Sequence, residues 1–104
     1  NDVAIRWGGD EFVLLLQAED EVSVKRAIEK VNDGVKQPFY FNGDPEPTFI
    51  SMSVGVSFFP AMSDDMSTLI KLADIAMYKA KQNKVSAPND YLFFADSASR
   101  NGSQ

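Results

Sequence analysis

The chain has 104 residues, a formal net charge of −5, 44% hydrophobic residues and neither cysteine nor histidine, which suits one domain with a packed core. The missing residue types exclude disulfides, thiolate metal sites and imidazole bases, and the negative charge argues against a nucleic-acid-binding surface. The apolar runs are short, which predicts no transmembrane helix, no signal peptide and no membrane contact from this segment.

The first predicted element is a β-hairpin. Two apolar β-type runs, residues 3–5 and 12–16, flank the segment 8–11, which reads Gly-Gly-Asp-Glu. A glycine pair supplies positive φ for a tight turn and lets a phosphate approach the backbone N–H groups. Asp10 and Glu11 carry the oxygen ligands that Mg²⁺ prefers beside substrate phosphates. The tip is therefore a candidate site for a metal-bound triphosphate, although the same turn chemistry also describes an ordinary structural hairpin.

A helix is predicted after this hairpin. Apolar residues between 24 and 35 recur at i, i+3, i+4, i+7 and i+11, the spacing of an amphipathic helix from about Glu21 to about Val35. Acidic residues at 19–21 stand where the positive end of the helix dipole would lie. Pro38 prevents the helix from continuing.

Two strands are predicted next. Residues 39–41 form a short aromatic run, and residues 42–47 are dense in turn formers. From about Thr48 to Phe58, large apolar residues alternate with serine and glycine, which predicts a strand with one core face and one small, polar face. Pro60 ends it.

The remaining elements are a second helix and a last strand. Residues 63–65 offer N-cap oxygens to a helix with an apolar stripe along 69–80 that stops near Asn83. Residues 91–94 read as a strand, and 95–104 as a polar tail that is expected to be disordered. The predicted order is ββαββαβ, an α+β fold with a mostly antiparallel sheet and helices packed on one face.

Three blocks of the sequence, residues 6–13, 51–57 and 69–81, together resemble the GGDEF family of diguanylate cyclases. The resemblance extends to Phe94 and implies a nucleotidyl-cyclase-like palm, whose central sheet is covered by helices on both sides. Residues 1–94 would then be the C-terminal portion of a GGDEF domain. The resemblance implies that the family's first strand and two helices, which carry another metal-binding aspartate and the guanine contacts, would lie ahead of this segment.

The resemblance implies roles by position. Asp10 matches the family's metal ligand, which binds Mg²⁺ or Mn²⁺ and is proposed to help deprotonate the attacking 3′-hydroxyl, and Glu11 matches an acid needed for activity. Gly8 and Gly9 match the backbone that lies against the nucleotide. Lys81 matches a lysine that contacts the triphosphate.

The sequence also departs from the family pattern. Val85 stands where the family has a phosphate-binding arginine, and Lys84 would replace it only as a point charge, without the bidentate fork. Asp2 matches the aspartate of the family's Arg-x-x-Asp product-inhibition site. Lys30 takes the position of a further arginine in that site, so inhibition by cyclic di-GMP would act through Asp2 and Lys30.

Five further residues of the three blocks are assigned no role in the candidate site. Trp7 and Phe12 are assigned to core packing, and Arg6, Lys71 and Asp74 to solvated surface charges.

The leading hypothesis is that the parent protein is a cytoplasmic diguanylate cyclase, which condenses two GTP molecules into cyclic di-GMP plus pyrophosphate. Catalysis would occur across a homodimer of domains, under an upstream sensory domain, and the fragment alone would be inactive. The alternative is a degenerate GGDEF module that binds GTP, cyclic di-GMP or a partner protein without catalysis. Val85 supports the alternative, and the intact Gly-Gly-Asp-Glu-Phe signature argues against it.

Overall fold

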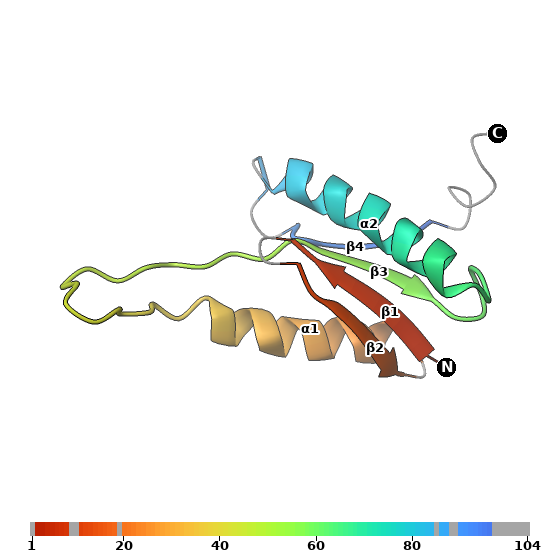
Figure 1. Ribbon diagram of the computed structural model, residues 1–104, viewed down its shortest axis with the longest axis horizontal. Helices are drawn as coiled ribbons and strands as arrows, with labels where there is room; N and C mark the ends of the chain where they lie inside the picture. Colours follow the sequence, from red (N-terminus) through yellow and green to blue (C-terminus); the bar gives the residue numbers. More distant parts are fainter. Residues whose placement is uncertain (1, 9–10, 19, 85, 88–89, 97–104) are drawn as a thin grey trace.

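A four-stranded mixed sheet forms the centre of the chain in the computed structural model, which describes residues 2–8, 11–18, 20–84, 86–87 and 90–96 (Figure 1). Its strands are β1 (Asp2–Trp7), β2 (Val13–Gln17), β3 (Val54–Phe58) and β4 (Leu92–Phe94), in the order β2-β1-β3-β4. β1 pairs antiparallel with β2 and β3, while β4 runs parallel to β3. The predicted α+β fold with a mostly antiparallel sheet is confirmed.

The two predicted helices are present as α1 (Glu21–Val35) and α2 (Met66–Asn83). An aspartate caps each N-terminus, because its carboxylate accepts the hydrogen bond of an otherwise unpaired backbone N–H group. Asp20 accepts from Ser23 N at 2.8 Å, and Asp65 accepts from Thr68 N at 2.9 Å and from Thr68 Oγ1 at 2.8 Å.

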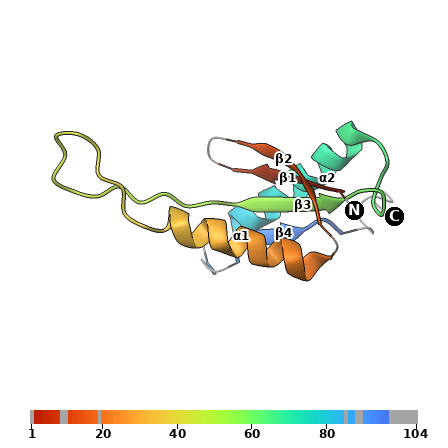
Figure 2. The same cartoon turned by 90° about the horizontal axis from the view of Figure 1, so that it is seen from below.

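One helix covers each face of the sheet (Figures 1 and 2). Successive residues of a strand point to opposite faces, and in β3 Val54 and Val56 join Val24 and Ile28 in the core under α1, whereas Gly55 faces α2. The pattern-based expectation of helices on one face was therefore wrong, and the family-based expectation of helices on both faces is confirmed. The small, polar face of β3 is buried beneath α2.

Gly55 allows α2 to approach the sheet closely. A Cβ atom at this position would lie 1.9 Å from the Ala73 carbonyl oxygen and 2.3 Å from the Met77 nitrogen. Nearby, the buried Ser57 hydroxyl donates a 2.6 Å hydrogen bond to the Leu69 carbonyl oxygen. The small residues of β3 thus form a helix-packing surface, which explains why their polarity was misleading at the sequence level.

Most of the segment 36–51 projects away from the sheet as a long arm (Figures 1 and 2), and the chain returns to the core at Met52 and Ser53. The predicted strand 39–41 is absent, and the strand predicted from Thr48 begins only at Val54, where pairing with β1 starts. Phe39 and Thr48 form an isolated antiparallel bridge. Because no described element covers the arm, its aromatic residues gain little by extending the sheet, and Phe49 is 69% exposed.

Packed structure continues one residue beyond the predicted domain end at Phe94. Ala95 is buried with Leu72 and Ala76, and its N–H group donates a 2.6 Å hydrogen bond to the Val56 carbonyl oxygen. The predicted disorder of the tail concerns mainly 97–104, which lie outside the described residues. Neither helix in the described part of the chain has the length and apolar character needed to cross a membrane.

Candidate functional site

The glycine end of the β1–β2 hairpin is fixed against β3 and α2. Trp7 N donates to the Phe12 carbonyl oxygen at 2.8 Å, and Gly8 N donates to the Ser53 carbonyl oxygen at 2.7 Å. A Cβ atom on Gly8 would lie 3.4 Å from both Met77 Sδ and Ser53 Cβ. Gly8 therefore packs against both neighbours. Of the other predicted tip residues, Gly9 and Asp10 lie outside the described part of the chain.

Glu11 is held by Arg6 across the hairpin. Its Oε1 atom accepts from Arg6 Nη2 at 2.9 Å and from Arg6 Nε at 3.1 Å. Arg6 Nε also lies 3.6 Å from Asp74 Oδ1 on α2. The prediction that Arg6 and Asp74 are only solvated charges was wrong. Strand alternation was the available signal, since it places Arg6 on the same face of β1 as Gly8, beneath α2.

Lys81 lies near the same end of the sheet. It follows Met77, which touches Gly8, by four residues, so it stands about one turn further along the same side of α2. Its side chain is exposed. Gly8, Glu11 and Lys81 thus lie toward one end of the molecule, although no described contact joins the lysine to the hairpin.

Lys84 is bound to the chain that leads into β3. Its Nζ atom donates to the Met52 carbonyl oxygen at 3.0 Å and to Ser51 Oγ at 3.2 Å. Burial lowers the pKa of this ammonium group, and the positive charge of Lys81 lowers it further. Both effects disfavour the charged form. Lys84 is therefore less free to bind phosphate than its sequence position indicated, and Val85 lies outside the described residues.

Few described side chains could bind a divalent metal ion at the hairpin. Among the described residues, no cluster of three or more Asp, Glu, His or Cys side chains gathers to hold an ion. Mg²⁺ commonly takes one or two carboxylates and completes its shell with water and substrate phosphates. Glu11 suits that pattern, because Arg6 occupies Oε1 while Oε2 accepts no hydrogen bond from the described residues.

The two residues of the predicted product-inhibition site lie on different elements. Asp2 is half-buried at the start of β1, where its carbonyl oxygen accepts from Phe59 N at 3.0 Å, and Lys30 is exposed on α1. No ion pair within the described ranges joins them. The inhibition site stays a prediction.

The two aromatic residues beside the signature differ in burial. Trp7 packs against the core under α1, as predicted. Phe12 makes an edge-on contact with the Trp7 ring at 5.7 Å between centroids but is 53% exposed, so its assignment to the core was wrong. β2 is an edge strand, and no described element covers Phe12.

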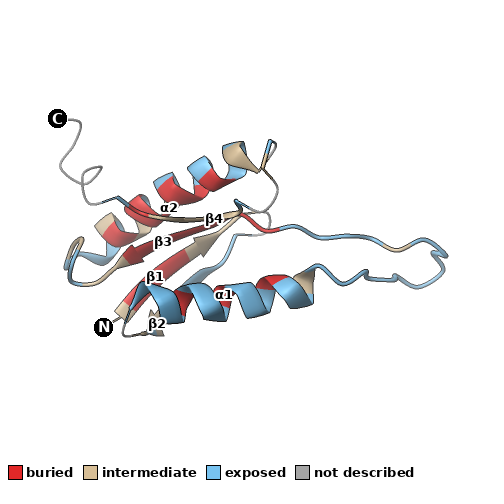
Figure 3. Cartoon of the chain, turned by 180° about the vertical axis from the view of Figure 1, so that it is seen from behind, coloured by how far each residue is buried: buried red, intermediate tan, exposed pale blue. Residues whose placement is uncertain are grey.

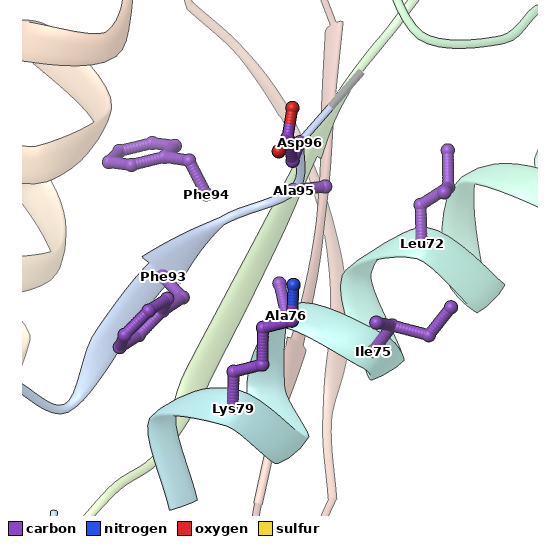
Figure 4. Close-up of a pocket in the computed structure, with 8 residues that line it drawn as sticks. All are labelled: Leu72, Ile75, Ala76, Lys79, Phe93, Phe94, Ala95 and Asp96. Carbon is purple, nitrogen blue, oxygen red and sulfur yellow. The ribbon is translucent and has the colours of Figure 1, made fainter. Parts of the chain in front are cut away.

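A separate hollow of about 390 Å³ lies between α2 and β4 (Figure 4). β4 is the edge strand opposite the signature hairpin. The lining is mainly apolar, and among the described residues its charged groups are Lys79 and Asp96. The hollow shares no residue with the hairpin end, so the candidate site remains the cluster around Gly8 and Glu11.

Comparison with known proteins shows the family of the chain. The model of the family described as "Diguanylate cyclase, GGDEF domain" matches residues 1–87. The bifunctional diguanylate cyclase/cyclic di-GMP phosphodiesterase MucR of Pseudomonas aeruginosa is 33% identical over 99% of this chain, which spans 14% of MucR. Diguanylate cyclase DosC of Escherichia coli K12 is 32% identical over 79% of the chain, which spans 18% of DosC.

The fold is also similar to that of solved structures. An EAL/GGDEF domain protein from M. capsulatus is 33% identical and superposes with a TM-score of 0.68, over 90% of this chain and 58% of that protein's chain.

Proposed function

This chain belongs to the GGDEF family of diguanylate cyclases, and on that premise we propose that the protein carrying it condenses two GTP molecules into cyclic di-GMP with release of two pyrophosphates. The supporting observation is the hairpin of the signature, in which Gly8 packs against Met77 and Arg6 fixes the Glu11 carboxylate. Lys81 lies on α2, the helix that also carries Met77. A carboxylate and an ammonium group are thus presented together at one end of the sheet.

Each residue has a distinct role in this proposal. Asp10 and Glu11, adjacent in the sequence, would hold the metal and the nucleotide, and Lys81 would contact the triphosphate as a positive point charge. The backbone of Gly8 and Gly9 lies against the nucleotide. A bound Mg²⁺ or Mn²⁺ would stabilise charge on the α-phosphate and favour ionisation of the 3′-hydroxyl. Two domains face each other in a homodimer, so that each hydroxyl attacks the α-phosphate held by the other.

The setting of the domain is also a proposal. The relatives are several times longer than this chain, which spans 14% of MucR and 18% of DosC. We place an upstream sensory domain in the parent protein and the reaction in the cytoplasm, where GTP is available. The isolated 104-residue segment is expected to be inactive.

A degenerate module that binds nucleotide without catalysis is the second candidate. Two observations favour it, namely Val85 in place of the phosphate-binding arginine and the engagement of Lys84 by Met52 and Ser51. These changes reduce the positive charge available to a triphosphate. They leave the acids of the signature in place.

The experiment uses the full-length protein with GTP and Mg²⁺, with cyclic di-GMP measured by mass spectrometry and GTP binding by calorimetry. We expect product from the wild type and none from Asp10→Asn. Lys81→Met is expected to raise KM about tenfold through the loss of a charge-assisted phosphate contact. Lys79→Met, two residues away on α2, is the matched control and should leave KM unchanged. GTP binding without product would favour the degenerate module. The absence of both GTP binding and product would refute both candidates.

A further inference from the structure

Arg6, Glu11 and Asp74 form a chain of alternating charges that joins the signature hairpin to α2. We propose that Arg6, anchored by Asp74, is a positioning residue that fixes the Glu11 carboxylate for its part in the reaction. The inference rests on the proposed function. It assigns a role to two residues that act through Glu11 rather than by touching the substrate.

The first step of the argument is the geometry at Glu11. Two guanidinium nitrogens of Arg6, Nη2 and Nε, donate to the same Oε1 atom at 2.9 and 3.1 Å. A planar guanidinium with two donors restrains a carboxylate in direction as well as distance, which a lysine ammonium does not. Oε1 is therefore committed to Arg6. Oε2 is the oxygen left for a metal ion or a nucleotide.

The second step is the anchor on α2. Asp74 Oδ1 lies 3.6 Å from Arg6 Nε, which is an ion pair rather than a direct hydrogen bond. Asp74 follows Ala73, whose carbonyl oxygen lies against Gly55 of β3. The backbone that carries Asp74 is thus held where α2 lies close against Gly55 of β3. Asp74 therefore restrains the Arg6 guanidinium from α2, independently of any movement of the hairpin.

The third step connects the anchor to Lys81. Asp74 and Lys81 lie on the same helix, seven residues or about two turns apart. A helix of this length keeps that separation fixed, so the restraint passing from Asp74 through Arg6 also sets Glu11 relative to Lys81. Glu11 of the hairpin and Lys81 of α2 are then held at a fixed separation.

The effect should appear in catalysis more than in stability. The side chains of Arg6, Glu11 and Asp74 are 28%, 44% and 47% exposed, and ion pairs as exposed as these contribute little to folding. Small displacements of a reacting group, by contrast, reduce the rate strongly. A positioning role therefore predicts lower kcat with little change in unfolding temperature.

The kinetic test uses the full-length protein with Arg6→Lys and Asp74→Asn. We expect both variants to lower kcat for cyclic di-GMP formation about tenfold or more while KM for GTP changes less than about twofold. Arg26→Lys and Asp33→Asn make the same chemical changes at exposed positions of α1 and should match the wild type. Equal kcat values for Asp74→Asn and Asp33→Asn would overturn the proposal.

A second readout separates this proposal from the proposed function. Nuclear spin relaxation of arginine ¹⁵Nε groups reports how rigidly each guanidinium is held, with or without turnover. We expect Arg6 to be more rigid than Arg26 in the wild type and to approach it in Asp74→Asn. Absence of product from the wild type would refute the proposed function alone. An Arg6 side chain as mobile as Arg26 in the wild type would refute the positioning role.

Discussion

The two faces of the sheet are covered by helices that differ in burial, since more of α2 than of α1 is buried (Figure 3). α2 lies close to the sheet through small residues, with Gly55 of β3 directly beneath Ala73. α1 packs through larger side chains, chiefly Val24 and Ile28, which form an ordinary apolar core with Val54 and Val56. The signature residues Arg6 and Gly8 lie on the α2 face. The comparison teaches that the face carrying Arg6 and Gly8 of the signature is the one on which the helix lies close to the sheet backbone.

The largest expected effect comes from placing a side chain at Gly55. Gly55→Val adds a Cβ where the Ala73 carbonyl oxygen is only 1.9 Å away, so α2 must separate from β3. Backbone atoms on a packed helix cannot rotate out of the way, and we expect a loss of about 3 kcal/mol or more in the free energy of unfolding. Urea denaturation followed by circular dichroism measures it.

Gly34→Ala in α1 is the matched control. Nothing lies within 4 Å of the position a Cβ would take there. Alanine in a helix restricts the unfolded chain and favours the folded one, so we expect a gain of about 0.5–1 kcal/mol. If Gly55→Val were tolerated as well as Gly34→Ala, the difference between the two faces would be refuted.

A smaller effect is expected at Ser57, which also faces α2. Its buried hydroxyl donates a 2.6 Å hydrogen bond to the Leu69 carbonyl oxygen. Ser57→Ala removes this bond without adding volume, and we expect about 1 kcal/mol less stability by urea denaturation. An unchanged free energy of unfolding would show that this polar contact is dispensable for α2 packing.

Each helix has an aspartate N-cap, so the pH dependence of stability can be compared between the α1 and α2 faces. Hydrogen bonds from Thr68 lower the pKa of Asp65, and those from Ser23 lower the pKa of Asp20, with a further contribution from Arg26. A depressed carboxylate pKa stabilises the folded state above the ordinary value of 3.8, and this stabilisation is lost as the pH falls below it. Asp65→Ala and Asp20→Ala should each lower the unfolding temperature by about 3–5 °C at pH 7.

The same variants should approach the wild type as the pH falls through the depressed pKa values of the two caps, because the wild-type carboxylates then become protonated. Added salt should reduce the effect of Asp20→Ala more than that of Asp65→Ala, since only Asp20 gains from a separated charge, Arg26. Equal salt dependence would show that Arg26 does not contribute.

Much of the fold could be predicted from sequence where one local signal decides the structure. The helix Glu21–Val35 and the strand 92–94 within 91–94 follow from periodicity and turn chemistry. The predicted start of this strand near Thr48 was wrong, because alternation alone does not show whether a partner strand exists, and β3 begins only at Val54. Serine and glycine at 53–57 look solvent-facing in sequence, and only tertiary packing shows that they receive α2.

The candidate site divides in the same way. The signature locates Gly8 and Glu11, because a motif is local in sequence. Arg6 and Asp74 were missed since their partnership joins positions 68 residues apart on β1 and α2. Lys84 was read as a phosphate ligand from its position alone, whereas the structure shows its ammonium group bound to Met52 and Ser51.

The smallest expected effect tests the more permissive α1 side. The Tyr91 ring packs against the core under α1, and its buried hydroxyl has no hydrogen-bond partner within the described residues. Burial, with Glu29 and Asp33 nearby, raises the pKa of Tyr91 above its ordinary value of 10.0. Removing an unsatisfied buried hydroxyl relieves its desolvation cost, so Tyr91→Phe should gain up to about 1 kcal/mol at pH 7.

The stability gained by Tyr91→Phe should depend on pH. A raised phenol pKa means that the folded state resists ionisation, so the wild type loses stability above about pH 10 as the unfolded chain ionises. Tyr91→Phe removes that loss, and its advantage should widen above pH 10 in urea denaturation. A destabilised Tyr91→Phe would instead reveal a hydrogen-bond partner for the hydroxyl, and the α1 face would then depend on a specific polar contact as the α2 face does at Ser57.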